Sequence, residues 1–297
     1  MPSGDSDSRP SREYVASVIV PAHNEARVIE RCLRSLLDGA AEGELEIVVA
    51  CNGCTDDTAA IAAAVDPSIR VVSTPVASKW GALDLGDAHA STFPRMYIDA
   101  DVEVSRRAVQ SLAAAMATSG AAVGAPTLRF PDMSTCRLPI RLFYRGWRCS
   151  PYFDDRLVGF GFYAISQAGR ERFGRFPETM AEDYFLHRLF ADEDRTVDPD
   201  SWFTPLLPQT LTDIIGVHSR QLVANSTLDA VAEGEGVQLP PHHRPAVWLP
   251  RAARDPRRWP ALAAFVSVRL VTMAVGARKR RQGEQVWTRD AGTHDGA

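Results

Sequence analysis

The first half of the chain alternates between short apolar runs and helical patterns, and this alternation restricts the possible folds most. Residues 15–20, 45–50 and 69–73 are short and apolar, and the first and third are rich in β-branched side chains. Such runs are typical of strands buried on both faces of a parallel sheet. Apolar residues at helical spacing follow the first run from residue 28 to 37, and Asn24 is placed to cap that helix. The order predicts a three-layer α/β/α domain with a mainly parallel central sheet.

The pattern continues and then becomes irregular. Ser105 predicts the start of a helix that reaches Met116, and a further short strand is expected at residues 121–125. Prolines, aromatic residues and arginines then become frequent. We interpret residues 137–148 as a short helix or an ordered loop, and residues 159–166 as a strand.

The apolar run at residues 95–98 ends in two aspartates, Asp99 and Asp101, with one alanine between them. Side chains alternate along a strand, so both carboxylates point the same way. Two neighbouring negative charges cost free energy unless a cation lies between them. Mg²⁺ or Mn²⁺ suits these oxygens and usually shares its coordination shell with substrate phosphates. The alternative is a strand end with two solvated aspartates.

Other polar groups follow the remaining strands. Residues 23–25 and 52–57 occupy loops at the carboxyl ends of strands, where α/β sheets bind ligands. Lys79 begins a helix and is either a phosphate neighbour or a solvated lysine. Glu182 and Asp183 open another helix, where they either act chemically or complement the helix dipole. The first strand is followed by neither a dinucleotide-binding glycine motif nor a phosphate-binding P-loop.

Composition narrows the class of protein. The 297 residues carry a formal net charge of −4, which does not indicate a nucleic-acid partner. Cys51 and Cys54 form a C-x-x-C without a second pair at zinc spacing, so reduced cytosolic thiols are the favoured interpretation over a redox site. Residues 1–13 are polar and predicted to be disordered. The segment closest to a transmembrane helix, residues 261–277, is interrupted by Arg269.

Several of these stretches together resemble family 2 glycosyltransferases of the GT-A fold. The order and spacing of five motifs carry the resemblance, which covers roughly residues 15–225. The motifs are residues 18–25, 48–58, 79–83, 99–101 and 181–183.

The resemblance implies a donor site for a nucleoside-diphosphate sugar. Pro21, His23 and Glu25 would line the nucleoside pocket. The turn at Asn52 would meet the base, and Lys79 would lie near the nucleotide. Where the family often has two aspartates this chain has Cys51-Asn52, which leaves the choice of nucleotide and sugar open.

The resemblance also implies roles in the reaction. Asp99 would lie near the ribose and a divalent metal, Mg²⁺ or Mn²⁺, which Asp101 would bind. Asp183 would be the general base that takes a proton from the acceptor hydroxyl in a single inverting displacement. Glu182 would instead hold an acceptor or a loop. Physical chemistry agrees, because a metal stabilises a departing diphosphate and a hydroxyl nucleophile needs a base.

The Gln-x-x-Arg-Trp motif typical of processive synthases is missing, so transfer of a single sugar is favoured over polymerisation. Residues 218–221 lie near where that motif would fall. Arg220 would assist the diphosphate there, and His218 is a weaker candidate metal ligand.

We predict a glycosyltransferase domain at residues 14–225, which consists of a nucleotide-sugar half (14–125) and an acceptor half (126–225). Residues 226–297 are predicted to form a linker or lid followed by a C-terminal amphipathic helix. Leu262, Phe265, Val266, Leu270 and Met273 are predicted to share one face of that helix, which a basic run, residues 278–281, follows.

The C-terminal helix either packs on the protein's own core or contacts an anionic membrane surface. We therefore expect a cytoplasmic enzyme of polysaccharide or glycolipid biosynthesis, with peripheral contact at the inner membrane face left open. Its acceptor is a hydroxyl of a small molecule, a glycan or a lipid-linked compound. The alternatives are a nucleotidyltransferase of related sheet architecture and a non-catalytic nucleotide-sugar-binding protein.

Overall fold

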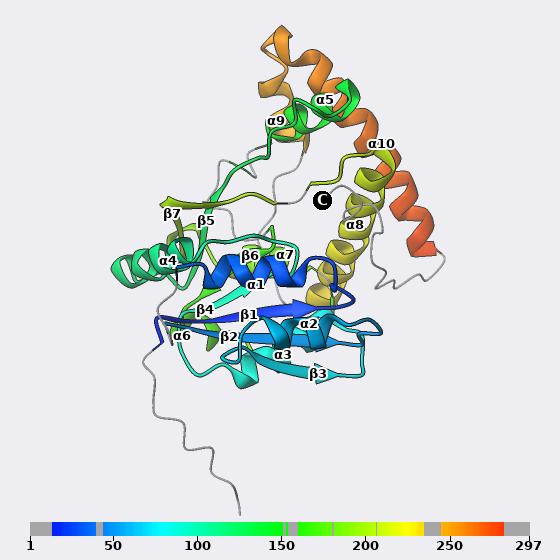
Figure 1. Cartoon of the computed structure of the whole chain (residues 1–297). Helices are drawn as coiled ribbons and strands as arrows, with labels where there is room; N and C mark the ends of the chain where they lie inside the picture. Colours follow the sequence, from blue (N-terminus) through cyan, green and yellow to red (C-terminus); the bar gives the residue numbers. More distant parts are fainter. Residues whose placement is uncertain are drawn as a thin grey trace, which may run out of the picture.

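The fold was analysed in a computed structural model, which describes residues 14–39, 44–150, 153, 160–179, 181–205, 207–234 and 245–281. The polar N-terminal stretch predicted to be disordered lies outside these residues. Figure 1 shows a twisted central sheet with helices on both faces and a group of helices standing beside it.

The sheet has seven strands in the order β3-β2-β1-β4-β6-β5-β7. The four strands β3, β2, β1 and β4 are mutually parallel, while β6 is antiparallel to both of its neighbours and β5 pairs in parallel with β7. The sheet is therefore mainly parallel, as predicted. The strands are β1 (Ala16–Ala22), β2 (Leu45–Asn52), β3 (Arg70–Thr74), β4 (Arg95–Ile98), β5 (Val123–Leu128), β6 (Phe162–Ile165) and β7 (Arg195–Phe203).

Helices cover the two faces because the buried strands are apolar on both. Val18 and Val20 of β1 belong to a core that includes α1, α2 and α4. Ile19, between them, points the other way and packs with α3 and α7. The predicted three layers are thus confirmed. The helices of these layers are α1 (Ile29–Leu37), α2 (Thr58–Val65), α3 (Lys79–His89), α4 (Arg106–Ser119), α6 (Gln167–Arg170) and α7 (Glu182–Leu189).

Four further helices form what we call the helical subdomain: α5 (Leu138–Trp147), α8 (Leu211–Gly234), α9 (Pro245–Ala252) and α10 (Trp259–Arg281). They share their own core, which includes Phe143 and Phe265. A Cβ on Gly146 of α5 would lie 2.3 Å from the Ala261 carbonyl oxygen of α10, so this close crossing requires glycine. Figure 1 places the subdomain along the upper and right margin of the sheet.

Local signals explain most of the boundaries. Ser78 and Ser105 cap α3 and α4, since each hydroxyl accepts a hydrogen bond from a backbone N–H three residues later. Helix α4 continues beyond Met116 and ends at Gly120, whose φ of 68° is left-handed. The Ser105 cap was predicted correctly, and α4 is one turn longer than predicted.

One expectation was wrong, and two further features of the fold were not anticipated. Asn24 does not cap α1, which begins at Ile29; Asn24 has a φ of 56° and accepts a hydrogen bond from the Thr55 backbone N–H instead. The boundary predicted at residue 225 falls inside α8, because no glycine or proline interrupts the helix there. Strand β7 was not predicted, because Pro199 and its acidic neighbours disfavour a strand; at the sheet edge they are tolerated.

Candidate active site

Three loops at the carboxyl edge of the sheet are joined around Asn52. Its side-chain amide donates to the Ala22 carbonyl at 2.9 Å and accepts from the Ser78 backbone N–H at 3.0 Å. His23 Nδ1 lies 2.6 Å from the Asn52 carbonyl oxygen. The Asn52 side chain is fully buried. It therefore fixes the ends of β1 and β2 and the start of α3, while the contact of this turn with a base stays a prediction.

Lys79, in the first turn of α3, connects two carboxylates from distant parts of the chain. Its Nζ lies 2.9 Å from Asp99 Oδ1 and 2.5 Å from Glu182 Oε1. Burial alone would lower the pKa of Lys79, but Asp99 and Glu182 hold it well above its ordinary value. Lys79 is therefore a buried cation at the centre of the site, which excludes the solvated-lysine alternative.

Glu182 is the more deeply buried member of this group. Burial raises the pKa of Glu182 to about 7, although Lys79 acts in the opposite direction. Its second carboxylate oxygen is buried without a hydrogen-bond partner among the described residues. Since it faces Lys79, Glu182 positions that lysine, and its carboxylate is engaged within the protein.

The surroundings of Asp101 disfavour its negative charge, as expected at a site that binds a cation. Burial, followed by the neighbouring Asp99 carboxylate, raises the pKa of Asp101 to about 6. Among the described residues no cluster of three or more acidic, histidine or cysteine side chains forms a complete metal cage. Mg²⁺ and Mn²⁺ sites that include substrate phosphates need only one or two protein carboxylates. Asp99 and Asp101 therefore have the chemistry for a divalent ion bound together with a diphosphate.

Asp183 is the first-turn neighbour of Glu182 on α7. Burial raises the pKa of Asp183, while Lys79 and the Tyr184 backbone N–H, 2.7 Å from its Oδ1, act against this. Asp99 raises it further. Asp183 and Asp101 thus respond to the same two side chains, Lys79 and Asp99, which places them in one electrostatic neighbourhood.

Two aspartates of α3 anchor the segments that carry these groups. Asp87 accepts from the Tyr97 hydroxyl at 2.6 Å and pairs with Arg95 and Arg170, which joins α3 to β4 and α6. Asp84 accepts from the Phe176 backbone N–H at 3.1 Å. Because α7 follows this segment, Asp84 helps to hold Glu182 and Asp183 beside Lys79.

The backbone passes close to Asp99 at Gly161. A Cβ at Gly161 would lie 2.9 Å from Asp99 Oδ2, and its φ of 83° is left-handed. The Asp99 backbone N–H also donates to the Gly161 carbonyl at 2.8 Å. Glycine is required here so that the loop before β6 can pass the carboxylate.

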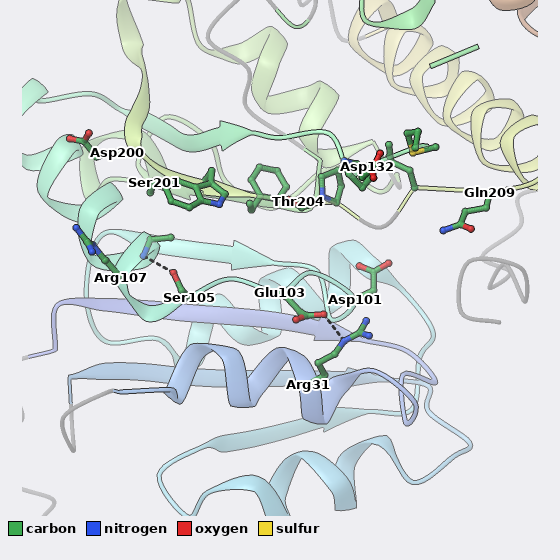
Figure 2. A pocket seen from close by; sticks show the side chains of 17 residues that line it. Arg31, Asp101, Glu103, Ser105, Arg107, Asp132, Asp200, Ser201, Thr204 and Gln209 are labelled. Carbon is green, nitrogen blue, oxygen red and sulfur yellow. Dashed lines mark hydrogen bonds and ion pairs between the residues drawn. The ribbon is translucent and has the colours of Figure 1, made fainter. Parts of the chain in front are cut away.

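A cleft of about 660 Å³ lies beside Asp101 (Figure 2). Glu103 and Arg31, whose Oε1 and Nε are 2.8 Å apart, lie along one wall. Thr204 and Trp202 also line the cleft, and Thr204 pairs with Glu103 in an isolated antiparallel bridge. Trp202 is 49% exposed, and the Arg129 guanidinium lies 3.6 Å from its ring centroid. The cleft offers carboxylates and an aromatic face to a polar molecule.

The remaining residues that the sequence predicted for the site have the following surroundings. Pro21 is buried within β1, and the Glu25 backbone accepts from the start of α1. Arg220 is half-buried on α8. The His218 ring packs edge-on against Trp147 at 4.8 Å and Phe143 at 5.5 Å, within the helical subdomain. No described contact brings His218 to Asp99 or Asp101.

The C-x-x-C pair is not a disulfide, since both cysteines are free. Burial raises the pKa of Cys51 to about 12. A redox-active thiol has a lowered pKa, so the raised pKa of Cys51 argues against a redox site at this motif.

Sequence reasoning missed the cleft and its supports. Glu103 follows the Asp-x-Asp closely, and its spacing gave a weak signal. Trp202 and Thr204 come from the unpredicted strand β7 and the residue after it, and no local pattern indicated them. Asp84 and Asp87 look like ordinary surface positions of an amphipathic helix.

Comparisons with known proteins agree with this geometry. The family described as Glycosyl transferase family 2 matches residues 17–172, more than half of the chain. No curated protein sequence matches significantly.

Solved structures show the same fold at low identity. One is the mannosyltransferase PcManGT from Pyrobaculum calidifontis in complex with GDP-Man and Mn²⁺, with a TM-score of 0.57, 20% identity, and coverage of 91% of this chain and 76% of that one. Another is glucosyl-3-phosphoglycerate synthase from Mycobacterium tuberculosis in complex with Mn²⁺, UDP-glucose and phosphoglyceric acid, with a TM-score of 0.53, 21% identity, and coverage of 71% and 78%. With the Asp-x-Asp, Lys79 and the Glu182-Asp183 pair assembled at one edge of the sheet, the chain belongs to glycosyltransferase family 2 and is a glycosyltransferase with a GT-A fold.

Proposed function

We propose that this enzyme moves one sugar from a nucleoside-diphosphate sugar to a hydroxyl acceptor, with inversion at the anomeric carbon and Asp183 as the general base. The observation that carries the proposal is the Lys79 bridge between Asp99 and Glu182, because it brings the end of β4 and the start of α7 together. Asp183 follows Glu182 directly, so a candidate base lies beside the candidate phosphate site.

The donor would bind at the carboxyl edge of β1 and β2. At this edge His23 Nδ1 lies within hydrogen-bond distance of the Asn52 carbonyl oxygen, and the Asn52 side chain donates to the Ala22 carbonyl. The helix α3 begins beside it, so its N-terminal dipole and the Lys79 ammonium favour a diphosphate. Arg220 is retained as a proposed second cation for that group.

Asp99 and Asp101 would hold a divalent ion, Mg²⁺ or Mn²⁺. The raised pKa of Asp101 supports this assignment, because an ion would relieve the repulsion that produces part of the shift. The ion supplies positive charge that stabilises the departing diphosphate. The similar mannosyltransferase and glucosyl-3-phosphoglycerate synthase structures are both complexes with Mn²⁺.

Asp183 would take the proton of the attacking hydroxyl. Its pKa is raised by burial, which makes the carboxylate a stronger base than a solvated aspartate. Glu182 is less suited to the role, because Lys79 lies 2.5 Å from one of its oxygens. Direct inversion needs one such base, and the arrangement provides one.

The cleft beside Asp101 is the proposed entry for the acceptor. Glu103 and Asp132 supply hydrogen-bond acceptors for hydroxyl groups, and Trp202 supplies an aromatic face. These are the groups that recognise polyhydroxylated compounds. A nucleotidyltransferase is not favoured, because the loop after β1 lacks a glycine-rich basic signature.

A two-stage experiment tests the proposal. A thermal-shift screen of nucleoside diphosphates with and without Mn²⁺ identifies the donor class, since a ligand that binds only the folded chain raises the melting temperature. Turnover of the matching nucleotide sugars is then measured by release of nucleoside diphosphate. Asp183→Asn should lower the rate by about 10² to 10⁴ while the nucleotide-induced thermal shift is retained.

Asp38→Asn, at an exposed carboxylate after α1, is the matched control and should keep full activity. If no nucleoside diphosphate raises the melting temperature with Mn²⁺ present, the donor site is wrong. If Asp183→Asn keeps the parent rate, the enzyme uses another base, and if no nucleotide sugar is turned over, the chain only binds them.

A further inference from the structure

The helices α5, α9 and α10 carry a strong positive charge that the rest of the chain does not share. Residues 137–148 and 245–281 contain thirteen basic residues and a single acidic one, Asp255, a formal net charge of +12. The whole chain has a net charge of −4, so the remaining residues together carry −16. The protein therefore has an acidic catalytic part and a basic helical part.

Most of these basic side chains are exposed, whereas Arg269 and Lys279 are half-buried. Among the described residues, only Arg258 of this set forms an ion pair with a carboxylate, Asp255 in the same turn. The four arginines of residues 137–148 are exposed, as are Arg278, Arg280 and Arg281 at the end of α10. Charges that are left unpaired on one part of a protein favour an anionic partner.

Exposed apolar side chains lie on the same helix. Leu270 is 62% exposed, Met273 52% and Val271 47%. The residues predicted to share one apolar face of α10 therefore have different surroundings. Leu262 and Phe265 are buried in the helical subdomain, whereas Leu270 and Met273 are exposed. Large exposed apolar side chains next to unpaired cations favour contact with a membrane interface.

An apolar hollow of about 440 Å³ adjoins this face. It lies between α9 and α10 and is lined by Leu249, Trp259, Ala263 and Val266, among others. Trp259 is 59% exposed and donates its indole N–H to the Ala253 carbonyl at 2.9 Å. Tryptophan prefers the boundary between hydrocarbon and water.

The helix is fixed on the fold along its length. Its Ala261 end meets Gly146 of α5, and its Gly276 end lies 3.7 Å from Leu222 of α8, measured from an added Cβ. By length and composition the segment Pro256–Arg281 is the one helix of the described residues that could cross a membrane, contrary to the expectation from sequence. Because neighbouring helices hold one side of it, the other side is free to lie along a surface.

We propose that α10, with α9 and the basic residues around it, docks the enzyme on a bilayer that carries anionic headgroups. Leu270, Val271 and Met273 enter the interface, and Arg278, Arg280 and Arg281 contact the headgroups. The helix lies parallel to the surface and does not span it. This surface is separate from the Lys79 site, so the proposal does not depend on the sugar donor or on Asp183.

Flotation of the full chain with vesicles tests the proposal. It should bind vesicles of phosphatidylcholine mixed with phosphatidylglycerol, remain unbound with phosphatidylcholine alone, and be released at about 1 M salt, where charges are screened beyond about 3 Å. Changing Arg278, Arg280 and Arg281 to Gln should weaken binding about a hundredfold. The same change at Arg34, Arg70 and Arg172, exposed arginines of the catalytic part, should leave binding unchanged.

A second pair of variants separates the apolar contribution. Leu270→Ser with Met273→Ser should weaken binding about tenfold, whereas Val15→Ser with Val76→Ser, also exposed, should not. No binding to anionic vesicles, equal binding to neutral ones, or binding that survives high salt would each overturn the proposal. A dimer in solution that Leu270→Ser dissociates would assign the face to a second copy and overturn it as well.

Discussion

The Lys79 ammonium lies 2.5 Å from the Glu182 carboxylate and 2.9 Å from that of Asp99. One cation therefore joins the end of a central strand to the helix that carries the candidate base. Removing one partner of a buried ion pair leaves an uncompensated charge, which is more costly than losing the attraction alone.

Lys79→Met should therefore destabilise the fold by about 3 kcal/mol, measured by urea unfolding. Adding Glu182→Gln should recover part of this loss, because the neutral amide no longer needs a cation. Lys79→Met with unchanged stability would show that the bridge is not formed in solution.

Asp101 should respond to substitution in two opposite ways. Its folded pKa, about 6, is above the unfolded value of about 3.9, so the folded chain binds more protons between these pH values and stability falls as pH rises through this range. Asp101→Asn should therefore raise the free energy of unfolding by about 1 kcal/mol above pH 6, after allowance for solvent screening, with no gain below pH 4.

The same variant should lose the Mn²⁺-dependent part of the thermal shift produced by a nucleoside diphosphate. Glu103→Gln, a carboxylate two residues further on, is the matched control and should retain it. An Asp101→Asn chain that keeps the metal-dependent shift would remove this residue from the proposed metal site.

Trp202 should affect the acceptor and not the donor. Trp202→Ala removes the exposed ring from the cleft wall, so the KM for the acceptor should rise about tenfold while the KM for the nucleotide sugar stays constant. Trp259→Ala, an exposed tryptophan of the helical subdomain, is the control. Equal changes in both KM values would place Trp202 outside the acceptor path.

His218 should make the fold sensitive to acid. Burial among Trp147 and Phe143 lowers its pKa to about 4, with Arg269 acting in the same direction. Between pH 4 and about 6.5 the unfolded chain binds a proton that the folded chain does not, so stability is full above pH 6.5 and decreases as pH falls.

His218→Phe should flatten this decrease in thermal-denaturation curves recorded across the range. A parent curve that is flat between pH 6.5 and 4 would contradict the buried neutral ring.

The sequence by itself determined six of the seven strands and most of the residues that define the family. Apolar runs such as β1 and serine caps such as Ser78 act within a few residues, so their signals are local. The side chains of Asp99 and Asp101 could be placed on one side of a strand from spacing alone. The basic run at the end of α10 could likewise be recognised as charge without a local partner.

Only the tertiary structure decided which of these groups meet. The contact of Lys79 with Glu182 depends on two elements that pack together across the sheet, and no local pattern encodes it. The same holds for Asn52, whose buried amide connects the ends of β1 and β2 to the start of α3. Trp202 lines the cleft because it lies on β7, whose amino-acid sequence disfavours a strand. Leu262 and Leu270 share a helix, yet one is buried and the other exposed, because the neighbouring helices cover only one side of it.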